Sequence, residues 1–76
     1  MTNGLPLWIS TDQADRLKAA LEAEGFENVS IGKGPFGGEI MVTGFDRGAD
    51  FNVRAGNPMD LEVVVPRFVK WREQRS

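Results

Sequence analysis

Residues 21–31 read Leu-Glu-Ala-Glu-Gly-Phe-Glu-Asn-Val-Ser-Ile, and the spacing of apolar side chains changes within this stretch. Before Gly25 the apolar residues recur at the three- and four-residue spacing of a helix, and after it they alternate as in a strand. Gly25, with Leu21 before it and Phe26 after it, fits a Schellman stop, in which the glycine adopts a left-handed conformation. The chain is therefore predicted to pass from a helix directly into a sheet at Gly25.

Start signals for the same helix lie upstream of this stop. Ser10 is a favourable N-cap, and Gln13 three residues later completes a capping box. Ile9 precedes the cap and can pack onto Ala14 as a hydrophobic staple. The sequence therefore predicts one amphipathic helix between Ser10 and the stop. The apolar residues that share one face of it are Ala14, Leu17, Ala20 and Leu21.

Beyond the helix, three short segments alternate apolar and other side chains, as strands do. The intervening segments 32–38 and 45–49 are short and contain glycine, so they favour antiparallel hairpins. A three-stranded antiparallel meander is therefore predicted, and the proline-containing segment 5–9 could add an N-terminal edge strand. The alternating apolar pairs are Val29 and Ile31, Ile40 and Val42, and Phe51 and Val53.

The C-terminal segment carries conflicting signals. The run Asn57-Pro58-Met59-Asp60 is typical of a helix start, with an N-cap, a proline at N1 and an acidic first turn. The β-branched run Val63-Val64-Val65 favours a strand, and Pro66 would interrupt a helix. We expect a C-terminal helix that is broken near Pro66, and a strand over 61–65 is the alternative. Helical spacing is kept by Leu61, Val64, Val65, Phe68 and Trp71.

These elements predict an α+β fold in two layers, ordered as an N-terminal helix, the meander and the C-terminal helix, with both helices on one face of the sheet. A chain of 76 residues is short for two cores, so residues 1–76 are expected to form a single small domain. Such a domain buries only about 60% of the surface that its unfolded chain exposes. Association with a partner protein, or with a second copy as a homodimer, would add stability.

The residue types that are missing from the chain narrow the range of functions that it could have. The chain contains no His, Cys or Tyr, so the usual acid–base shuttle, thiolate nucleophile and commonest transition-metal ligand are absent. Residues 32–37 spell Gly-Lys-Gly-Pro-Phe-Gly, but a predicted strand follows them, whereas a dinucleotide-binding turn leads into a helix. We therefore expect a protein that is not an enzyme and that binds no cofactor or metal ion.

Charge is unevenly distributed along the chain. The net charge is −2, but residues 66–76 carry four bases and one acid, a sum of +3, and the remainder carries five bases and ten acids, a sum of −5. No stretch approaches the about 20 apolar residues of a membrane span, and the start Met1-Thr2-Asn3-Gly4 lacks the basic and apolar regions of a signal peptide. A cytoplasmic location without membrane association is expected.

Strand parity predicts a partner-binding face. Because Ile40 and Val42 must point toward the helices, Met41 and Phe45 must point away from them and be exposed. Apolar and arginine side chains that lose water on contact supply most of the binding free energy at such surfaces. The predicted partner-binding residues are Met41, Phe45 and Arg54 at the centre, Glu39 at the rim, and Phe36 at the tip of the preceding loop.

The basic C-terminal segment supports an alternative function. Bases and aromatic side chains interleave in it, a pattern that can neutralise phosphates and stack on nucleic-acid bases. A competing interpretation places Phe68 in the core together with Trp71, and the basic residues at the C-terminal end of the helix, where its dipole favours them. The predicted nucleic-acid-binding residues are Arg67, Lys70, Trp71, Arg72 and Arg75.

The favoured hypothesis is a protein-binding module that blocks or adapts a larger assembly, for example a small inhibitor of the phage or mobile-element type. Small size, an acidic balance and the missing catalytic residue types suit it. A nucleic-acid-binding domain that uses the basic aromatic tail is the alternative. The acidic remainder of the chain disfavours that alternative because it repels phosphate.

Overall fold

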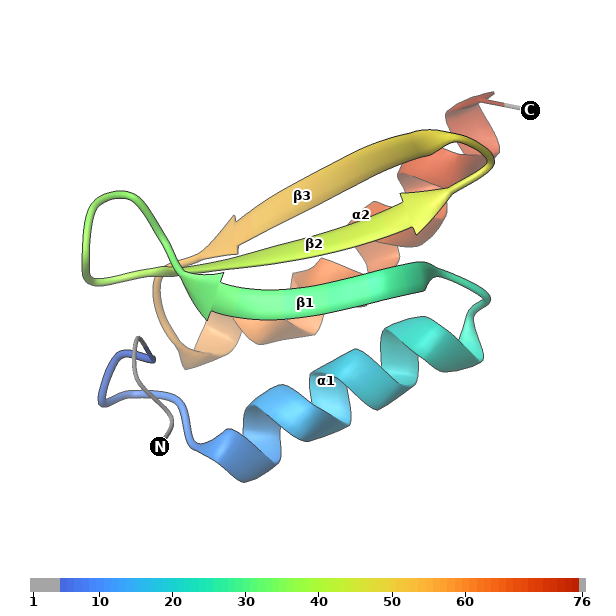
Figure 1. Ribbon diagram of the computed structural model, residues 1–76. Coiled ribbons are helices and arrows are strands. Elements are labelled where there is room, and N and C mark those ends of the chain that lie inside the picture. The colour runs from blue at the N-terminus through green and yellow to red at the C-terminus, as the bar shows by residue number, and fades with distance from the viewer. Residues whose placement is uncertain (1–4, 76) are drawn as a thin grey trace.

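The computed structural model describes residues 5–75, so the expectation about a signal peptide at residues 1–4 lies outside it, as does residue 76. The strands form one antiparallel sheet in the order β1-β2-β3, and both helices lie on the same side of it (Figure 1). The predicted two-layer α+β fold is confirmed. The elements are α1 (Thr11–Ala23), β1 (Glu27–Lys33), β2 (Ile40–Asp46), β3 (Ala49–Ala55), the short 3-10 helix η1 (Pro58–Asp60) and α2 (Leu61–Arg75).

Both ends of α1 form as the sequence predicts. Ser10 Oγ accepts a hydrogen bond from the backbone N–H of Gln13 at 3.1 Å, and the Gln13 side chain accepts one from the N–H of Ser10 at 2.9 Å. At the other end Gly25 has a φ of +102°, and the N–H of Phe26 donates to the carbonyl oxygen of Leu21 at 3.2 Å. The capping box and the Schellman stop are both confirmed.

The pairing of β2 with β3 is continuous from end to end. Asp46 lies opposite Ala49, and the two residues between them, Arg47 and Gly48, have φ values of +51° and +84°. Two successive positive φ angles are what a type I′ hairpin turn requires, and this turn suits the right-handed twist of the strands that it joins.

The pairing of β1 with β2 contains a β-bulge. The register shifts between Glu27 and Ser30, and Asn28 in this interval has a φ of +51°. Because the extra residue belongs to β1, the alternation of side chains along β2 is undisturbed. Met41 and Phe45 therefore point away from the helices, as strand parity predicts.

The core lies between the sheet and the helices, with Phe68 of α2 in its middle. The Phe68 side chain is fully buried and meets the rings of Phe26 and Phe51 edge-on, at 5.2 and 5.1 Å between ring centroids. A Cβ atom added at Gly44 would lie 2.8 Å from Phe68 Cε2, so the bare glycine lets the ring sit directly on β2. Ala20, expected on the buried face of α1, is exposed. The other buried hydrophobic residues are Ile9, Ala14, Leu17, Leu21, Val29, Ile40, Val42, Val53, Ala55 and Val64.

The C-terminal segment is helical, so the alternative of a strand over residues 61–65 is wrong. The side chain of Asn57 accepts hydrogen bonds from the N–H groups of Met59 and Asp60 at 2.9 and 3.1 Å. The predicted N-cap is therefore in place, with Pro58 directly after it in the first turn of η1.

The expected break near Pro66 does not occur, because α2 continues from Leu61 to Arg75 with the proline inside it. Proline removes one backbone hydrogen bond, to the carbonyl of Glu62, and Glu62 is exposed, so water can satisfy that group. Val64 and Phe68, on either side of Pro66, are both fully buried. Their packing holds the two halves of the helix against the sheet.

Residues 5–9 do not add the predicted edge strand, since the sheet of the described residues consists of β1, β2 and β3 alone. The segment forms a turn, in which the N–H of Ile9 donates to the carbonyl oxygen of Pro6 at 3.3 Å. Trp8 Nε1 donates to the carbonyl oxygen of Gly38 at 2.9 Å. The turn brings Ile9 to its buried position before α1, which a straight strand would not do.

Replacing Gly25 by Ala is expected to lower the free energy of unfolding by about 1 kcal/mol, because a Cβ strains the backbone at positive φ. Space is not the cause, since Arg72 Nη1, the nearest heavy atom to an added Cβ, is 3.7 Å away. Gly32→Ala is the matched control, because an added Cβ there meets nothing within 4 Å. Urea unfolding of both variants measures the difference, and equal stabilities would contradict the strain at Gly25.

Gly44→Ala is expected to cost more, about 1–3 kcal/mol, because the new methyl group overlaps the buried Phe68 ring. Combining it with Phe68→Leu should recover part of that loss. A double-mutant cycle measured by urea unfolding gives the coupling between the two positions. Purely additive effects would show that the ring does not rest on Gly44.

Candidate partner-binding surface

The side of the sheet that faces away from the helices is covered by no element of residues 5–75 (Figure 1). We call it the outer face. Strand pairing arranges its side chains in rows across the sheet, where neighbours on adjacent strands contact one another. The rows are Glu27, Phe45 and Asp50; Ser30, Thr43 and Asn52; and Gly32, Met41 and Arg54.

Four of the five predicted partner-binding residues gather at one end of the outer face. Arg54 pairs with Met41 in the strand register, and its Nη1 lies 3.9 Å from Glu39 Oε2. The guanidinium carbon of Arg54 is 5.6 Å from the centre of the Phe36 ring, within the range of a cation–π contact. The Phe36 side chain is 78% exposed. We call Phe36, Glu39, Met41 and Arg54 the loop-end cluster.

Glu39 is less accessible than its predicted position at the rim implies. Its side chain is 19% exposed and lies over Gly34, where an added Cβ would overlap Glu39 Cγ. Its Oε2 atom is buried and accepts no hydrogen bond from residues 5–75, and Arg54 supplies the neighbouring positive charge. Glu39 therefore ties the β1–β2 loop to β3 through Arg54.

Phe45 lies on the same face but near the opposite end of β2 from the loop-end cluster. The register places its ring between Glu27 and Asp50, so acidic side chains flank it on both neighbouring strands. Phe45 and Met41 were both expected to be exposed, but each is only partly exposed. The side chains of the adjacent strands shelter them, which strand parity alone does not reveal.

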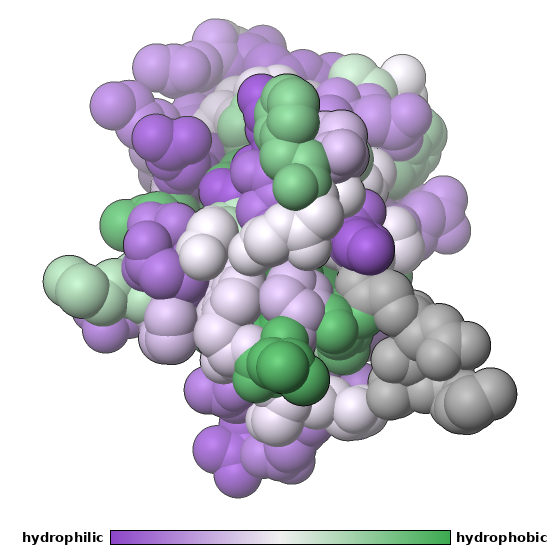
Figure 2. Space-filling view, turned by 90° about the vertical axis from the view of Figure 1, so that its left-hand side faces the viewer, coloured by the Kyte–Doolittle hydropathy of each residue, from purple (hydrophilic) through white to green (hydrophobic). Residues whose placement is uncertain are grey.

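Exposed apolar side chains occur mainly at the end of the molecule that carries the β1–β2 loop. The largest exposed fractions belong to Leu7, Phe36 and Met59, at 105%, 78% and 77%. Figure 2 shows this end, where apolar residues stand as separate groups among polar ones. Single exposed apolar residues are common on protein surfaces. Phe36 is therefore distinguished by its contact with Arg54, and exposure alone would not single it out.

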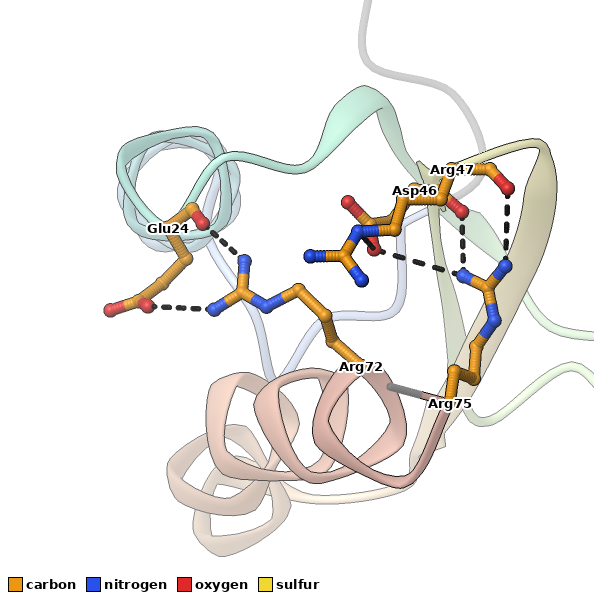
Figure 3. Close-up of polar contacts among 5 residues, drawn as sticks. All are labelled: Glu24, Asp46, Arg47, Arg72 and Arg75. Atoms are coloured by element: carbon orange, nitrogen blue, oxygen red, sulfur yellow. Dashed lines mark hydrogen bonds and ion pairs between the residues drawn. The ribbon is translucent and has the colours of Figure 1, made fainter.

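Two members of the predicted nucleic-acid-binding set, Arg72 and Arg75, are engaged inside the protein (Figure 3). Arg72 donates to the carbonyl oxygen of Glu24 at the end of α1, and its Nη2 lies 3.5 Å from the Glu24 carboxylate. Arg75 donates to the carbonyl oxygens of Asp46 and Arg47 at 2.7 and 3.1 Å. Because α1 has no basic residue in its own last turn, Arg72 supplies the cation that the negative end of its dipole favours.

The remaining members, Arg67, Lys70 and Trp71, do meet at one place. Together with Phe51 and Gln74 they line an open hollow of about 330 Å³ beside β3. The Trp71 ring stacks on Phe51 with 4.8 Å between centroids, and further contacts join it to neighbouring side chains of the protein. The indole ring of Trp71 is therefore already in contact with other side chains of the protein. Within residues 5–75 no ion pair joins Arg67 or Lys70 to an acid.

A second open hollow, of about 340 Å³, lies between α1 and β1 and was not predicted. The small side chain of Ala14 on the buried face of α1, flanked by Asp15 and Lys18, is the signal that the sequence offered. The strand that covers this part of α1 is set by the Schellman stop, which folds β1 back along the helix. The lining residues are Leu5, Thr11, Ala14, Asp15, Lys18, Val29, Ser30 and Ile31.

Among residues 5–75, no three side chains that could hold a metal ion lie together, and no helix is long and apolar enough to cross a membrane. Comparison with protein families, curated proteins and solved structures finds no match.

We expect no tight nucleic-acid binding at physiological salt, because Arg72 and Arg75 are held internally and the chain outside residues 66–76 is acidic. Fluorescence anisotropy with single-stranded and duplex probes measures this. Sub-micromolar binding that weakens steeply with salt would contradict the expectation if Arg67→Gln/Lys70→Gln abolishes it. That variant leaves Arg72 and Arg75 in place, so it should keep its fold.

Proposed function

We propose that this chain is a non-enzymatic protein-binding module whose outer face contacts a partner protein. The loop-end cluster carries the proposal: an exposed aromatic ring, an arginine and a methionine meet on a sheet face that no element of residues 5–75 covers. Aromatic and arginine side chains supply most of the binding free energy at many protein interfaces. Methionine adapts its shape to a facing surface.

Contacts on both sides hold the loop that presents Phe36. The N–H of Gly34 donates to the carbonyl oxygen of Glu39 at 2.8 Å, which closes the base of the loop. Trp8 holds the carbonyl oxygen of Gly38 at 2.9 Å from the other side. A loop that is already ordered loses little conformational entropy when a partner binds, and this supports a recognition role for its tip.

The charges on the outer face indicate the chemistry of the partner surface. Glu27 and Asp50 flank Phe45 at one end, and the side chain of Arg54 is half exposed at the other. A complementary protein would present an apolar centre, basic groups opposite the two acids and an acceptor opposite Arg54. The same two acids make the face a poor match for nucleic acid, whose phosphates they repel.

A stoichiometric blocker or adaptor of a larger assembly is the specific form of this proposal, with a small inhibitor of the phage or mobile-element type as one example. The chain of 76 residues offers a face of three strands. Such a face can occupy a site on a larger protein, where contact alone prevents or redirects further assembly.

Removing the apolar groups of the cluster with Phe36→Ser/Met41→Ser is expected to weaken partner binding by at least about 2 kcal/mol, roughly 30-fold in Kd. Both side chains lie outside the core, so the thermal unfolding transition should stay cooperative. The measurement is affinity capture from the cells that make the protein, followed by titration calorimetry with the captured partner. Phe45→Ser tests in the same assay whether the interface reaches the acidic end.

The matched control is Met59→Ser/Val63→Ser, which removes two apolar side chains, 77% and 46% exposed, from the helical side. It should retain the partner that the cluster variant loses. If the cluster variant and the wild type bind the same protein equally well, the outer face is not the binding surface.

A further inference from the structure

We propose that a second copy of this chain pairs with the first through the edge of β1 that no other strand of residues 5–75 occupies, so that two three-stranded sheets join into one antiparallel sheet. β1 is an edge strand, and α1 lies along it in the helical layer (Figure 1). Unpaired backbone groups on an edge strand readily accept another strand. The outer face stays accessible in such a dimer, so this pairing is independent of the proposed partner surface.

The hairpin turn between β2 and β3 determines which residues of β2 direct their backbone N–H and carbonyl groups toward β3 and which direct them toward β1. In a two-residue hairpin the closing pair, here Asp46 and Ala49, exchanges hydrogen bonds, and bonded and non-bonded pairs alternate from there. Counting back along β2, the backbone groups of Met41 and Thr43 must therefore point away from β3 and toward β1.

On β1, Gly32 and Ser30 lie opposite these two residues and use their backbone groups to bond to β2. Successive residues of a strand direct their N–H and carbonyl groups to opposite edges. Ile31 therefore directs both of its groups out of the sheet. Val29 lies within the β-bulge, and its carbonyl group also points outward, because it is antiparallel to the N–H of Ser30 across their trans peptide. A further strand can bond to these groups.

The hollow of about 340 Å³ between β1 and α1 continues this edge into the helical layer. Val29 and Ile31 face the helices, so a strand added beside them places its own inward side chains over the hollow. A second β1 brings its own Val29 and Ile31 to that position. The apolar lining of the hollow, which includes Leu5 and Ala14, suits them.

A two-fold axis through Ser30 matches complementary groups in both layers. In the sheet it sets Val29 opposite Ile31 of the second copy, so the carbonyl group of Val29 meets the N–H of that Ile31, and the axis repeats this contact. In the helical layer an axis at the same level sets Asp15 opposite Lys18 of the second copy, and Lys18 opposite Asp15. All five residues line the same hollow, and opposite charges face each other twice.

One axis can serve both layers because α1 and β1 are antiparallel and joined by the turn at Gly25, so distances along both can be measured from that residue. The midpoint between Asp15 and Lys18 lies about 13 Å from Gly25 along the helix, and Ser30 lies about 16 Å from it along the strand. The β-bulge at Asn28 shortens the path along the strand further.

The other edge of the sheet does not have this self-complementarity. The hollow beside β3 is lined by Arg67 and Lys70, so a second copy placed there would bring like charges together. Charge therefore selects the edge at β1 for self-pairing.

A cross-link tests the register directly. The chain contains no cysteine, so Ser30→Cys gives each copy a single thiol. In the proposed pair the two Cα atoms lie about 4.5 Å apart, within the roughly 4.4–6.8 Å that a disulfide spans. Mild oxidation should convert this variant to a covalent dimer at least about tenfold faster than Asn52→Cys. Asn52 occupies the same row of the outer face on β3, at the other edge.

A charge exchange tests the helical layer. Sedimentation equilibrium from about 1 μM to about 1 mM should show the wild type passing from monomer to dimer. Asp15→Lys should raise the dissociation constant at least about tenfold, because the new lysine faces Lys18 of the second copy. Adding Lys18→Asp to it should restore most of the affinity. Asp50→Lys, which changes the net charge equally but lies on β3, should have little effect.

A wild-type chain that stays monomeric at about 1 mM overturns the proposal and leaves the edge open to an extended peptide instead. Equal cross-linking of the two cysteine variants overturns it as well. So does an equal response to Asp15→Lys and Asp50→Lys, or a failure of the double exchange to recover affinity. Unfolding melts of each variant confirm that the fold is kept.

Discussion

The ring of Phe68 rests on the bare backbone of Gly44, and the arrangement of the two layers follows from this contact. A side chain at position 44 would hold α2 away from β2. The ring would then lose its edge-on contacts with Phe26, directly after α1, and with Phe51 on β3. One aromatic side chain thus joins the sheet, the C-terminal helix and the turn after α1. Most of the remaining core packs around this junction.

The charge separation along the sequence is partly offset in three dimensions, because two of the four bases in residues 66–76 lie near acidic side chains. The basic tail lies against acidic or carbonyl-rich turns, because Arg72 reaches the end of α1 and Arg75 reaches the hairpin between β2 and β3. These two arginines donate hydrogen bonds to backbone carbonyl groups and so stabilise the turn after α1 and the turn between β2 and β3. The basic residues that could bind a polyanion together in an extended chain therefore have separate positions in the fold. Arg72 and Arg75 stabilise turns, and Arg67 and Lys70 line the hollow beside β3.

Local signals in the sequence were enough to predict α1, the three strands of the sheet and the facing of side chains along β2. Capping box, Schellman stop and turn depend on neighbouring residues, and parity along β2 follows once Ile40 is placed inside. The continuation of α2 through Pro66 was not predictable in this way, because it depends on packing from a distant sheet. The destinations of Arg72 and Arg75 lie 48 and 29 residues away in the chain. Likewise, the loop-end cluster joins residues of one loop and two strands, so its members could be named separately but their contacts could not.

Because Phe68, Arg72 and Arg75 come after Phe26, Glu24 and Asp46 in the chain, the sheet leaves the ribosome before the helix that closes it. A hairpin forms in about 1–10 μs, whereas docking of preformed units takes milliseconds or longer. The hairpin of β2 and β3 can therefore open and close repeatedly before α2 docks on its apolar face. Until α2 docks, that face is open to water and to other chains.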